Sequence, residues 1–508
     1  MTEATMGTLW LGLDVGTTAV KAAAYTPEGR QVALAEAPSR VRQVAGGGSE
    51  QDMEQVWQTV VAVLAELAGR CDGAAFAALG IAAQGDGLWC VTEAGDPAGP
   101  AMLWNDTRTA DDLATLEASG ATGVIGRGCN TSLWSGTSGM LWRWLREHRP
   151  EMAAQTAHVM TCVDWIGLKL TGALGTDYSD ATIPFLDIAS RSYAPAQIAA
   201  LGCEDLADKL IAPRPADSVL GQVTAAAAQA TGLPAGLTVS VGTLDLSAMI
   251  TGMGLANAGE TMMIMGTTAV VNILTDQITP TDAPVGASCL HPTAPVTIRV
   301  LAPTTGAAAF DWFAALHPKS LGGASAGEVA ARMNALVETV PPGANGVTFL
   351  PYLNGERAPF VAPNLRGAFH GLSSTTSTGD MGRAVMEGAA LSLRHCFEEE
   401  TGLPTAPVQL TGGGSKNPVW CQIIADVMGQ PVLVSAASDH GLWGAACLGA
   451  AAAGLGEAVA LAARDEDLQS YTPKDHAAYG PVYARYALIS RHHRALQADL
   501  NTLRETTT

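Results

Sequence analysis

Basic residues are scarce in this chain. Its 508 residues include 28 Lys and Arg against 48 Asp and Glu, which leaves a formal net charge of -20 at pH 7. Nucleic-acid binding depends on clusters of basic side chains, so we expect no nucleic-acid partner. A small phosphorylated ligand remains compatible with this composition, because backbone N–H groups, helix N-termini and a metal ion can hold phosphate without a basic surface.

Paired cysteines and long apolar runs are also missing. The nine cysteines are scattered and form no C-x-x-C pair, which argues for reduced thiols in the cytoplasm and against a zinc site or a disulfide framework. The N-terminus has neither a basic leader nor a long apolar core, so we expect no secretory signal. The most apolar stretch, residues 441–456, ends at Glu457 and is too short to cross a membrane. It predicts a buried helix, and we expect no membrane partner.

Hydrophobic residues make up 48% of the chain and charged residues only 15%, enough to form substantial cores. A chain of this length exceeds what one core holds in most proteins, which favours two domains. A polar stretch with two prolines, residues 212–227, precedes the second half. We therefore expect an N-terminal domain over residues 1–250 and a C-terminal domain over residues 251–508.

Both halves show the same order of elements. In the first half, strand patterns at 8–16, 19–26 and 31–40 precede an amphipathic helix at 53–69 and a buried strand at 77–85. This is a β-meander followed by a helix and a further strand.

In the second half, a buried strand at 237–245 precedes a hairpin formed by 260–266 and 269–274. A helix over 379–400 and a strand beginning at 408 follow. The chain thus predicts two α/β domains of similar design.

The sequence Gly-Thr-Thr-Ala-Val occurs twice, at Gly16–Val20 and at Gly266–Val270, each time between two strand patterns. Such a turn offers closely spaced N–H groups, two hydroxyls and a glycine that admits a ligand close to the backbone. It is also an ordinary hairpin turn with strand-forming threonines. Asp14 precedes the first turn, where its carboxylate could hold Mg²⁺ or cap the turn.

These motifs resemble the FGGY family of carbohydrate kinases. Residues 9–30 resemble the first phosphate motif of that family, 261–273 its second, and 410–432 its adenosine motif. Gly367–Gly388 resembles the C-terminal signature. Residues 136–151 match the N-terminal signature less fully, with Leu141 where many members carry lysine.

The resemblance implies an α/β fold of two actin/hexokinase-like (ribonuclease H-like) ATPase domains flanking a central cleft. The N-terminal domain would bind the sugar and the C-terminal domain ATP, with Mg²⁺ held by Asp14, and the enzyme could be a homodimer. The expected phosphate and adenosine contacts are Gly16, Thr17, Thr18, Lys21, Gly266, Thr267, Thr268, Gly412, Gly413, Gly414 and Asn417.

Asp245 is the candidate general base. It ends an apolar strand pattern, where a carboxylate is costly to bury, and the family places its catalytic aspartate in the matching motif. The alternative is that Asp245 is a solvent-facing loop aspartate without a catalytic role. Xylulose kinases commonly read Gly-Gly-Gly-Asp-Asn here, and Leu246 replaces the final asparagine.

Two segments point to different substrates. Gln84, Gly85 and Asp86 stand where xylulose kinases usually carry Gln-Met-His, and this form resembles kinases of erythritol and of L-xylulose-type substrates. Trp104 and Asn105 instead resemble the xylulose-kinase segment. Asp86 can accept hydroxyl hydrogen bonds, and a tryptophan can stack on a sugar face.

Three functions therefore stay open: a kinase of a ketopentose such as xylulose; a kinase of erythritol, another short polyol, L-xylulose or ribulose; or an actin-like ATPase-fold binding protein without sugar kinase activity. The segment Thr176–Thr182 also resembles a substrate-side segment of the family. Its Asp177 and Asp180 could equally cap a helix.

Overall fold

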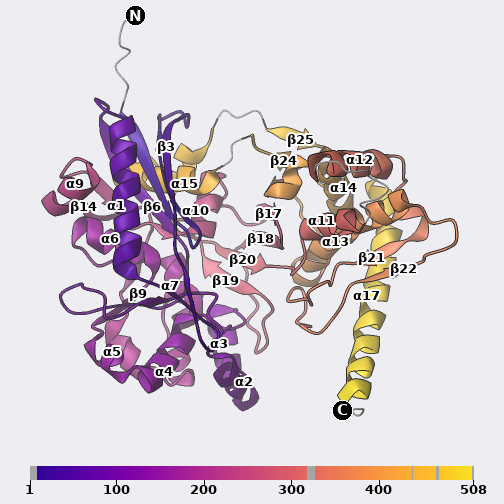
Figure 1. The fold of residues 1–508 in the computed structure, drawn as a ribbon, viewed down its shortest axis with the longest axis horizontal. Helices are drawn as coiled ribbons and strands as arrows, with labels where there is room; N and C mark the ends of the chain where they lie inside the picture. The colour runs from indigo at the N-terminus through magenta and orange to yellow at the C-terminus, as the bar shows by residue number, and fades with distance from the viewer. Residues whose placement is uncertain (1–7, 317–325, 437–438, 465–467, 506–508) are drawn as a thin grey trace, which may run out of the picture. The chain divides into compact units, whose positions relative to one another are not determined.

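The computed structural model describes residues 8–316, 326–436, 439–464 and 468–505. The described residues form two compact units (Figure 1). Unit 1 comprises those within Met1–Ala258, Thr275–Ile298 and Ala437–Asp465, and unit 2 those within Gly259–Leu274, Arg299–Ala436 and Glu466–Thr508. Two later segments thus belong to the same unit as the N-terminal half. The division into domains at residue 250 stays a prediction.

The central sheet of unit 1 has the strand order β14-β15-β6-β1-β2-β3, and β16 also pairs with β6. Its strands are β1 (Leu9–Val15), β2 (Ala19–Tyr25), β3 (Gln31–Pro38), β6 (Phe76–Ala83), β14 (Val219–Gln222), β15 (Thr238–Ser240) and β16 (Thr243–Leu244). The first three strands form the predicted meander, and β6 runs parallel to β1.

Helices cover both faces of this sheet because its strands alternate between two apolar faces. Leu11 and Leu13 of β1 join one core with α1 (Met53–Arg70) and α6 (Cys162–Thr171). Trp10 points to the other face and stacks on Trp443 of α15 (His440–Ala452), with ring centroids 5.7 Å apart. The predicted helix at 53–69 is confirmed as α1.

Glycines let α15 approach the sheet backbone to backbone. A Cβ on Gly12 of β1 would lie 2.0 Å from the carbonyl oxygen of Leu442, and one on Gly80 of β6 would lie 1.7 Å from that of Ala445. This close contact explains why residues 441–456 are rich in Ala and Gly. The predicted buried helix is present as α15, but it ends at Ala452, and residues 454–456 are exposed. None of the helices described has the length and apolarity needed to span a membrane.

The other elements of unit 1 lie around this sandwich (Figure 1). They are β4 (Arg42–Val44), β5 (Gly48–Gln51), β7 (Trp89–Val91), β8 (Ala101–Met102), α2 (Ala110–Ser119), α3 (Ala121–Cys129), α4 (Ser138–His148), α5 (Pro150–Gln155), β9 (His158–Met160), β10 (Thr176–Asp177), α7 (Tyr178–Phe185), β11 (Leu186–Asp187), β12 (Ser192–Tyr193), α8 (Pro195–Ala200), η1 (Glu204–Lys209), β13 (Pro213–Arg214), α9 (Ala225–Thr231), α10 (Asp245–Gly252), β19 (Ala287–Leu290) and α16 (Ala458–Ala462).

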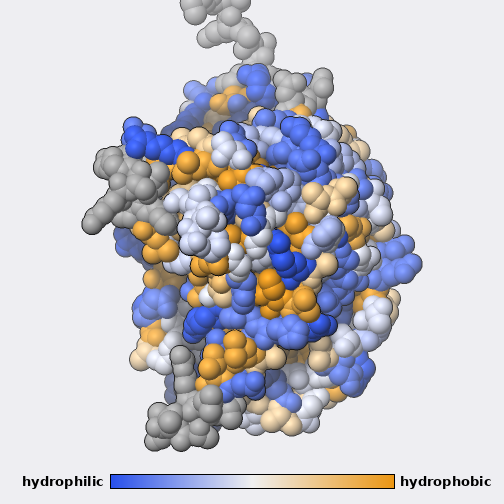
Figure 2. All heavy atoms as spheres, turned by 90° about the vertical axis from the view of Figure 1, so that its right-hand side faces the viewer, coloured by the Kyte–Doolittle hydropathy of each residue, from blue (hydrophilic) through white to orange (hydrophobic). Residues whose placement is uncertain are grey.

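Unit 2 contains the sheet order β20-β18-β17-β23-β24-β25. Its elements are β17 (Thr261–Met265), β18 (Ala269–Thr275), β20 (Thr297–Leu301), α11 (Ala308–Ala315), α12 (Ala326–Glu338), η2 (Ala344–Gly346), β21 (Thr348–Leu350), β22 (Ala368–His370), α13 (Thr378–Glu400), β23 (Val408–Thr411), η3 (Gly413–Lys416), α14 (Pro418–Met428), β24 (Val432–Val434), β25 (Gln469–Tyr471) and α17 (His476–Glu505). The predicted hairpin at 260–274 and the helix at 379–400 are confirmed. Figure 2 shows a face on which hydrophobic side chains lie in small groups among hydrophilic ones, as is normal for a folded protein.

Candidate active site

The first Gly-Thr-Thr sequence forms the turn between β1 and β2. The N–H of Gly16 donates to the carbonyl oxygen of Ala19 at 2.9 Å, and the carbonyl oxygen of Thr18 accepts from the N–H of Ser39 at 2.8 Å. The side chain of Thr18 is exposed. The predicted hairpin turn is therefore present, while its role in binding phosphate stays a prediction.

Three parallel strands of unit 1 end beside this turn. Val15 of β1 pairs with Ala83 of β6, which pairs with Leu244 of β16. Since parallel strands present their carboxyl ends at one edge of a sheet, the residues that follow them come together. These are Gly16, Thr17, Gln84, Gly85, Asp86 and Asp245. Residues far apart in the sequence thus share one edge.

A chain of side-chain hydrogen bonds links this edge to Trp104. The indole Nε1 of Trp104 donates to Oγ1 of Thr17 at 3.1 Å, and that hydroxyl donates to Oε1 of Gln84 at 2.7 Å. Nε2 of Gln84 donates to Oε1 of the buried Gln51 at 2.7 Å. Thr17 and Gln84 are held in position by this network.

The Trp-Asn-Asp segment separates into an exposed part and a structural part. Trp104 is 44% exposed, and Asn105 is also exposed. Asp106 is buried, where it accepts a hydrogen bond from the N–H of Ser49 at 2.9 Å and forms an ion pair with Arg108. Trp104 and Asn105 are the members of this segment that a ligand could reach.

Asp86 stands in a loop with unusual backbone geometry. Its φ of 55° is left-handed, and the next residue, Gly87, has a φ of 77°. A Cβ on Gly87 would lie 2.5 Å from the carbonyl oxygen of Met102, so only glycine fits there. Burial, with a smaller effect from Asp245, raises the pKa of Asp86 to about 7. Non-glycine residues in this conformation are often found at functional sites.

Asp245 begins a helix, whereas the sequence pattern placed it at the end of a strand. Strand β16 ends at Leu244, and Asp245 is the first residue of α10. Its Oδ1 accepts a hydrogen bond from the N–H of Leu246 at 2.6 Å. Surrounding protein raises the pKa of Asp245 although the side chain is exposed, and the Leu246 bond opposes the rise. Leu246 thus contributes a backbone N–H, which does not depend on its side chain.

Asp14 lies near the end of β1 with one oxygen unused. Its Oδ1 is buried and has no hydrogen-bond partner within the part of the chain that the structure describes. Burial raises the pKa of Asp14 to about 7, the charges of Asp245 and Asp439 add to the rise, and Lys21 opposes it. Lys21 forms an ion pair with Asp439 at 3.3 Å.

Within the described ranges, no three His, Cys, Asp or Glu side chains form a metal-binding group. Mg²⁺ is commonly held by one or two carboxylates with phosphate oxygens and water. The unpartnered oxygen of Asp14 fits that donor set.

The second Gly-Thr-Thr turn lies in unit 2 beside the glycine run. Strands β17 and β23 are parallel, and Ile264 pairs with Thr411. Their carboxyl ends therefore bring the turn at Gly266 next to Gly412. Gly306, which the sequence analysis did not single out, donates its N–H to the carbonyl oxygen of Thr267 at 3.0 Å.

A Cβ on Gly306 would lie 2.6 Å from the carbonyl oxygen of Gly266. The segment containing Gly306 therefore packs directly on the turn, together with the exposed Thr267 and the half-buried Thr268. No local pattern marks Gly306, because its place beside the turn depends on this contact between distant segments.

The glycine run is partly structural. Gly412 has a φ of 93°, and a Cβ on Gly414 would lie 2.3 Å from Cγ of Met265, whereas nothing lies within 4 Å of a Cβ on Gly413. Gly413 is thus the glycine with open space beside it. The run continues into η3 before α14 begins, so a helical turn separates the glycines from the expected helix.

Asn417 caps helix α14. Its Oδ1 accepts from the N–H groups of Val419 and Trp420 at 3.1 and 3.3 Å, and its Nδ2 donates to Asn334 at 2.9 Å. Side-chain atoms of Asn417 are thus engaged within the protein, which favours a positioning role over direct contact with adenosine.

Comparison with known proteins gives a family for this geometry. The N-terminal domain of the FGGY family of carbohydrate kinases matches residues 9–265, and the C-terminal domain of the same family matches residues 261–453. This chain belongs to the FGGY family of carbohydrate kinases. It is an ATP-dependent sugar kinase, which decides against the alternative of a binding protein without that activity.

Relatives of this FGGY kinase act on several substrates. Xylulose kinase of Streptomyces rubiginosus is 33% identical over 485 residues, which cover 91% of each chain. Erythritol kinase of Brucella abortus (strain 2308) is 30% identical over 463 residues, which cover 88% of each. The crystal structure of xylulose kinase from Rhodospirillum rubrum matches with a TM-score of 0.85 and 25% identity over 96% of this chain and 100% of that one. The predicted α/β fold of actin/hexokinase-like domains is confirmed.

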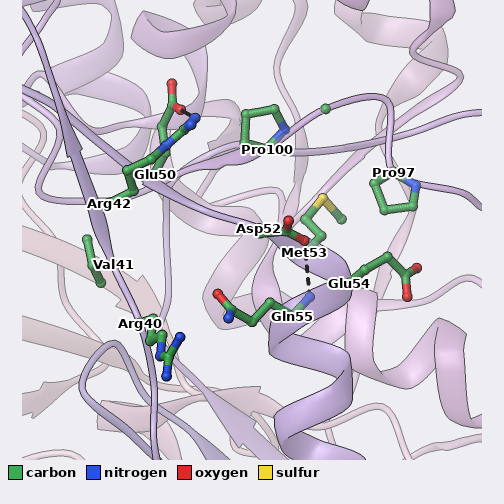
Figure 3. Close-up of a pocket in the computed structure, with 11 residues that line it drawn as sticks. Arg40, Val41, Arg42, Glu50, Asp52, Met53, Glu54, Gln55, Pro97 and Pro100 are labelled. Atoms are coloured by element: carbon green, nitrogen blue, oxygen red, sulfur yellow. Dashed lines mark hydrogen bonds and ion pairs between the residues drawn. The ribbon is translucent and has the colours of Figure 1, made fainter.

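A cavity of about 610 Å³ in this FGGY kinase lies at the start of α1 (Figure 3). Four of its charged groups are engaged within the protein. Arg42 pairs with Glu50 at 2.6 Å, Glu54 pairs with Lys169 at 2.9 Å, and Asp52 caps α1 by accepting from the N–H of Gln55. None of the predicted site residues lines it.

Asp180 is a polar group near the strand ends that the sequence analysis left undecided. Asp177, the other aspartate of that segment, is the N-cap of α7 and accepts from the N–H groups of Ser179 and Asp180. The cap therefore comes from Asp177 alone. Both side-chain oxygens of Asp180 are buried, and no group in the described ranges forms a hydrogen bond with them.

Proposed function

We propose that this FGGY kinase transfers the γ-phosphoryl group of ATP to a hydroxyl of a ketopentose, with xylulose as the first candidate. The observation that supports this best is the meeting of Asp14, Asp86 and Asp245 at the carboxyl ends of parallel strands in unit 1. Relatives that act on xylulose, and the exposed pair Trp104 and Asn105, favour this acceptor.

In this proposal Asp245 accepts the proton of the attacking hydroxyl. A general base works best when its pKa lies near the operating pH, and the protein raises the pKa of Asp245 towards that range. The N–H of Leu246 fixes one carboxylate oxygen, which leaves the other to meet the substrate. Phosphoryl transfer needs little more from the protein than alignment and charge stabilisation.

The two Gly-Thr-Thr turns would hold the phosphate groups of ATP through their N–H groups and hydroxyls. They belong to different units, so their joint binding of one nucleotide stays a prediction. Asp14 would hold Mg²⁺, which neutralises charge on the phosphate oxygens when bound. Gly413 is the member of the glycine run best suited to approach by adenosine.

A short polyol such as erythritol is the second candidate acceptor. It is favoured by Asp86, whose carboxyl can bond two hydroxyl groups, and by a relative that acts on erythritol. L-xylulose and D-ribulose are further candidate acceptors, because the loop of Gln84, Gly85 and Asp86 resembles the corresponding loop in kinases of L-xylulose-type substrates.

A substrate panel tests the proposal. ADP release is measured with D-xylulose, L-xylulose, D-ribulose, erythritol and glycerol, each with ATP and Mg²⁺. We expect D-xylulose to have the highest kcat/KM. Erythritol in first place would replace the ketopentose by the polyol, and ATP turnover without phosphorylated product for any acceptor would overturn both.

Asp245→Asn supplies the control for the proposed base. The amide keeps the shape of the side chain but cannot accept the proton, so turnover should fall about 10²–10⁴-fold. ATP affinity, measured by calorimetry, should change little. Near-normal turnover in this variant would show that another group is the base.

We propose further that the enzyme is a cytoplasmic homodimer. The family resemblance supports the dimer, and the nine free thiols support a reducing compartment. Sedimentation equilibrium tests the dimer, and a monomer at micromolar concentration would contradict it.

A further inference from the structure

Asp180 is a buried carboxyl whose hydrogen-bonding capacity is unused. It is 6% exposed, and neither side-chain oxygen has a hydrogen-bond partner among the described residues. Asp177, three residues earlier, is fully buried but accepts from Ser179 and Thr243 as well as from the N–H of Asp180. An unpaired buried polar group costs free energy. Asp180 therefore needs an explanation that Asp177 does not.

The side chain of Asp180 is directed at the loop predicted to bind the sugar. Its Oδ1 would lie 3.2 Å from a Cβ placed on Gly85, and Cβ of Leu244 would lie 3.1 Å from that position. A larger residue at 85 would push against both neighbours. Gly85 therefore leaves room for Asp180 between the loop and the strand that leads to Asp245.

Asp86, Asp180 and Asp245 form one electrostatic group, the carboxyl trio. Burial raises the pKa of Asp180 well above its usual range, and Asp177, Asp164, Asp86 and Asp245 raise it further. Asp245 likewise raises the pKa of Asp86. Each of these neighbours is negative when it ionises, so a further anion among them would be disfavoured.

We propose that Asp180 is a substrate-binding residue and that the carboxyl trio selects neutral polyhydroxylated acceptors over sugar acids. This inference rests on the proposed function of the site. In a group of carboxyls of which only some are protonated, the protonated ones donate hydrogen bonds and the ionised ones accept them. Hydroxyl groups can be partners of both kinds. A sugar carboxylate would bring a further negative charge to the carboxyl trio. It would also leave Asp180 without a hydrogen-bond partner, so the acid would bind more weakly than a neutral acceptor.

The test compares neutral and acidic acceptors matched in carbon number, D-xylulose with D-xylonate and erythritol with D-erythronate. We expect the wild-type enzyme to favour the neutral member by about 100-fold or more in kcat/KM, the size of about two lost polar contacts. Comparable rates for the acid would overturn the inference while the kinase function stands. Failure with every neutral acceptor would instead overturn the proposed function together with it.

Asp180→Asn and Asp177→Asn provide a matched pair on one helix. For Asp180→Asn we expect KM for the preferred neutral acceptor to rise about tenfold. The ratio of kcat/KM for the neutral acceptor to kcat/KM for the acid should fall. Tm should stay the same or rise, because a buried unpaired carboxyl is removed. Asp177→Asn should lower Tm, since its carboxyl accepts several hydrogen bonds. An unchanged KM, or a fall in Tm as large as that of Asp177→Asn, would show that Asp180 is structural.

Discussion

In the proposed site, single aspartates carry much of the chemistry, and burial rather than sequence context raises their pKa values. Asp14 and Asp86 each have a pKa raised to about 7, chiefly by burial and secondarily by Asp245. A carboxyl whose pKa is higher in the folded than in the unfolded state lowers the stability of the folded protein when it ionises. These residues therefore lower the stability of unit 1 at neutral pH, a cost often found at active sites.

Asp86→Asn should reveal this cost as a pH-dependent gain in stability. Between pH 3.8 and about 7 the folded state binds more protons at Asp86 than the unfolded state, so unfolding free energy falls as pH rises. The variant does not show this fall, because Asn does not ionise. The difference in unfolding free energy between the variant and the wild type should therefore increase by about 1–2 kcal/mol from pH 5.5 to pH 8, since each pH unit below the folded pKa contributes about 1.4 kcal/mol. Urea denaturation at both pH values measures it.

The exposed Asp72→Asn is the control for that measurement, because it changes the same chemical group on the surface. Its effect should be equal at the two pH values. A gain for Asp86→Asn that is larger at pH 5.5 than at pH 8 would contradict the assigned direction of the pKa shift.

Helix α15 shows how an element can be specified by its contacts. Two of its glycines, Gly444 and Gly449, touch the backbone of neighbouring elements: a Cβ on Gly444 would lie 1.9 Å from the carbonyl oxygen of Ala248 in α10. Gly80 and Gly12 allow the same approach from the sheet. This contact holds Asp439, the N-cap of α15, near Lys21 and Asp14. Helix packing and the site are thus connected.

Two glycine-to-alanine changes in helices should have opposite effects. Gly444→Ala would force α15 from α10 and should destabilise unit 1 by at least about 2 kcal/mol. Gly69→Ala in α1 meets nothing within 4 Å, so the higher helix propensity of alanine should stabilise by about 0.5–1 kcal/mol. Denaturant unfolding compares both with the wild type. Equal shifts in the two variants would refute the close contact of α15 and α10.

At the scale of the whole molecule, the cysteines are buried and unreactive in the folded state. All nine are free and buried. Burial raises the pKa of Cys129 to about 11 and that of Cys90 to about 12, so little thiolate forms at neutral pH. The thiols therefore serve as small apolar core residues, in agreement with the absence of C-x-x-C pairs.

A thiol titration checks this arrangement. With a chromogenic disulfide reagent at pH 8, fewer than about one thiol per chain should react within minutes in the native enzyme, since thiolate and access are both required. In guanidinium chloride all nine should react. Rapid reaction of several thiols in the native enzyme would contradict their burial.

Much of the fold could be predicted locally. The meander of β1 to β3, helix α1 and the hairpin of β17 and β18 follow from apolar periodicity and turn residues. Asp245 was identified as a candidate, but its placement at the end of a strand was wrong. Strand β16 is only two residues long, and the helix that starts at Asp245 is set by packing of α10 on α15.

The sequence by itself determined the family, the two turns and the aspartates that the motifs contain, because each depends on residues close together in the chain. The tertiary structure alone decided which of those groups meet. Parallel pairing of β1, β6 and β16 brings together residues from positions 14 to 245, and α7 adds Asp180 through contacts with Gly85. Burial and mutual repulsion among carboxyls exist only after that assembly, so the sequence around Asp180 could not distinguish a binding residue from a helix cap.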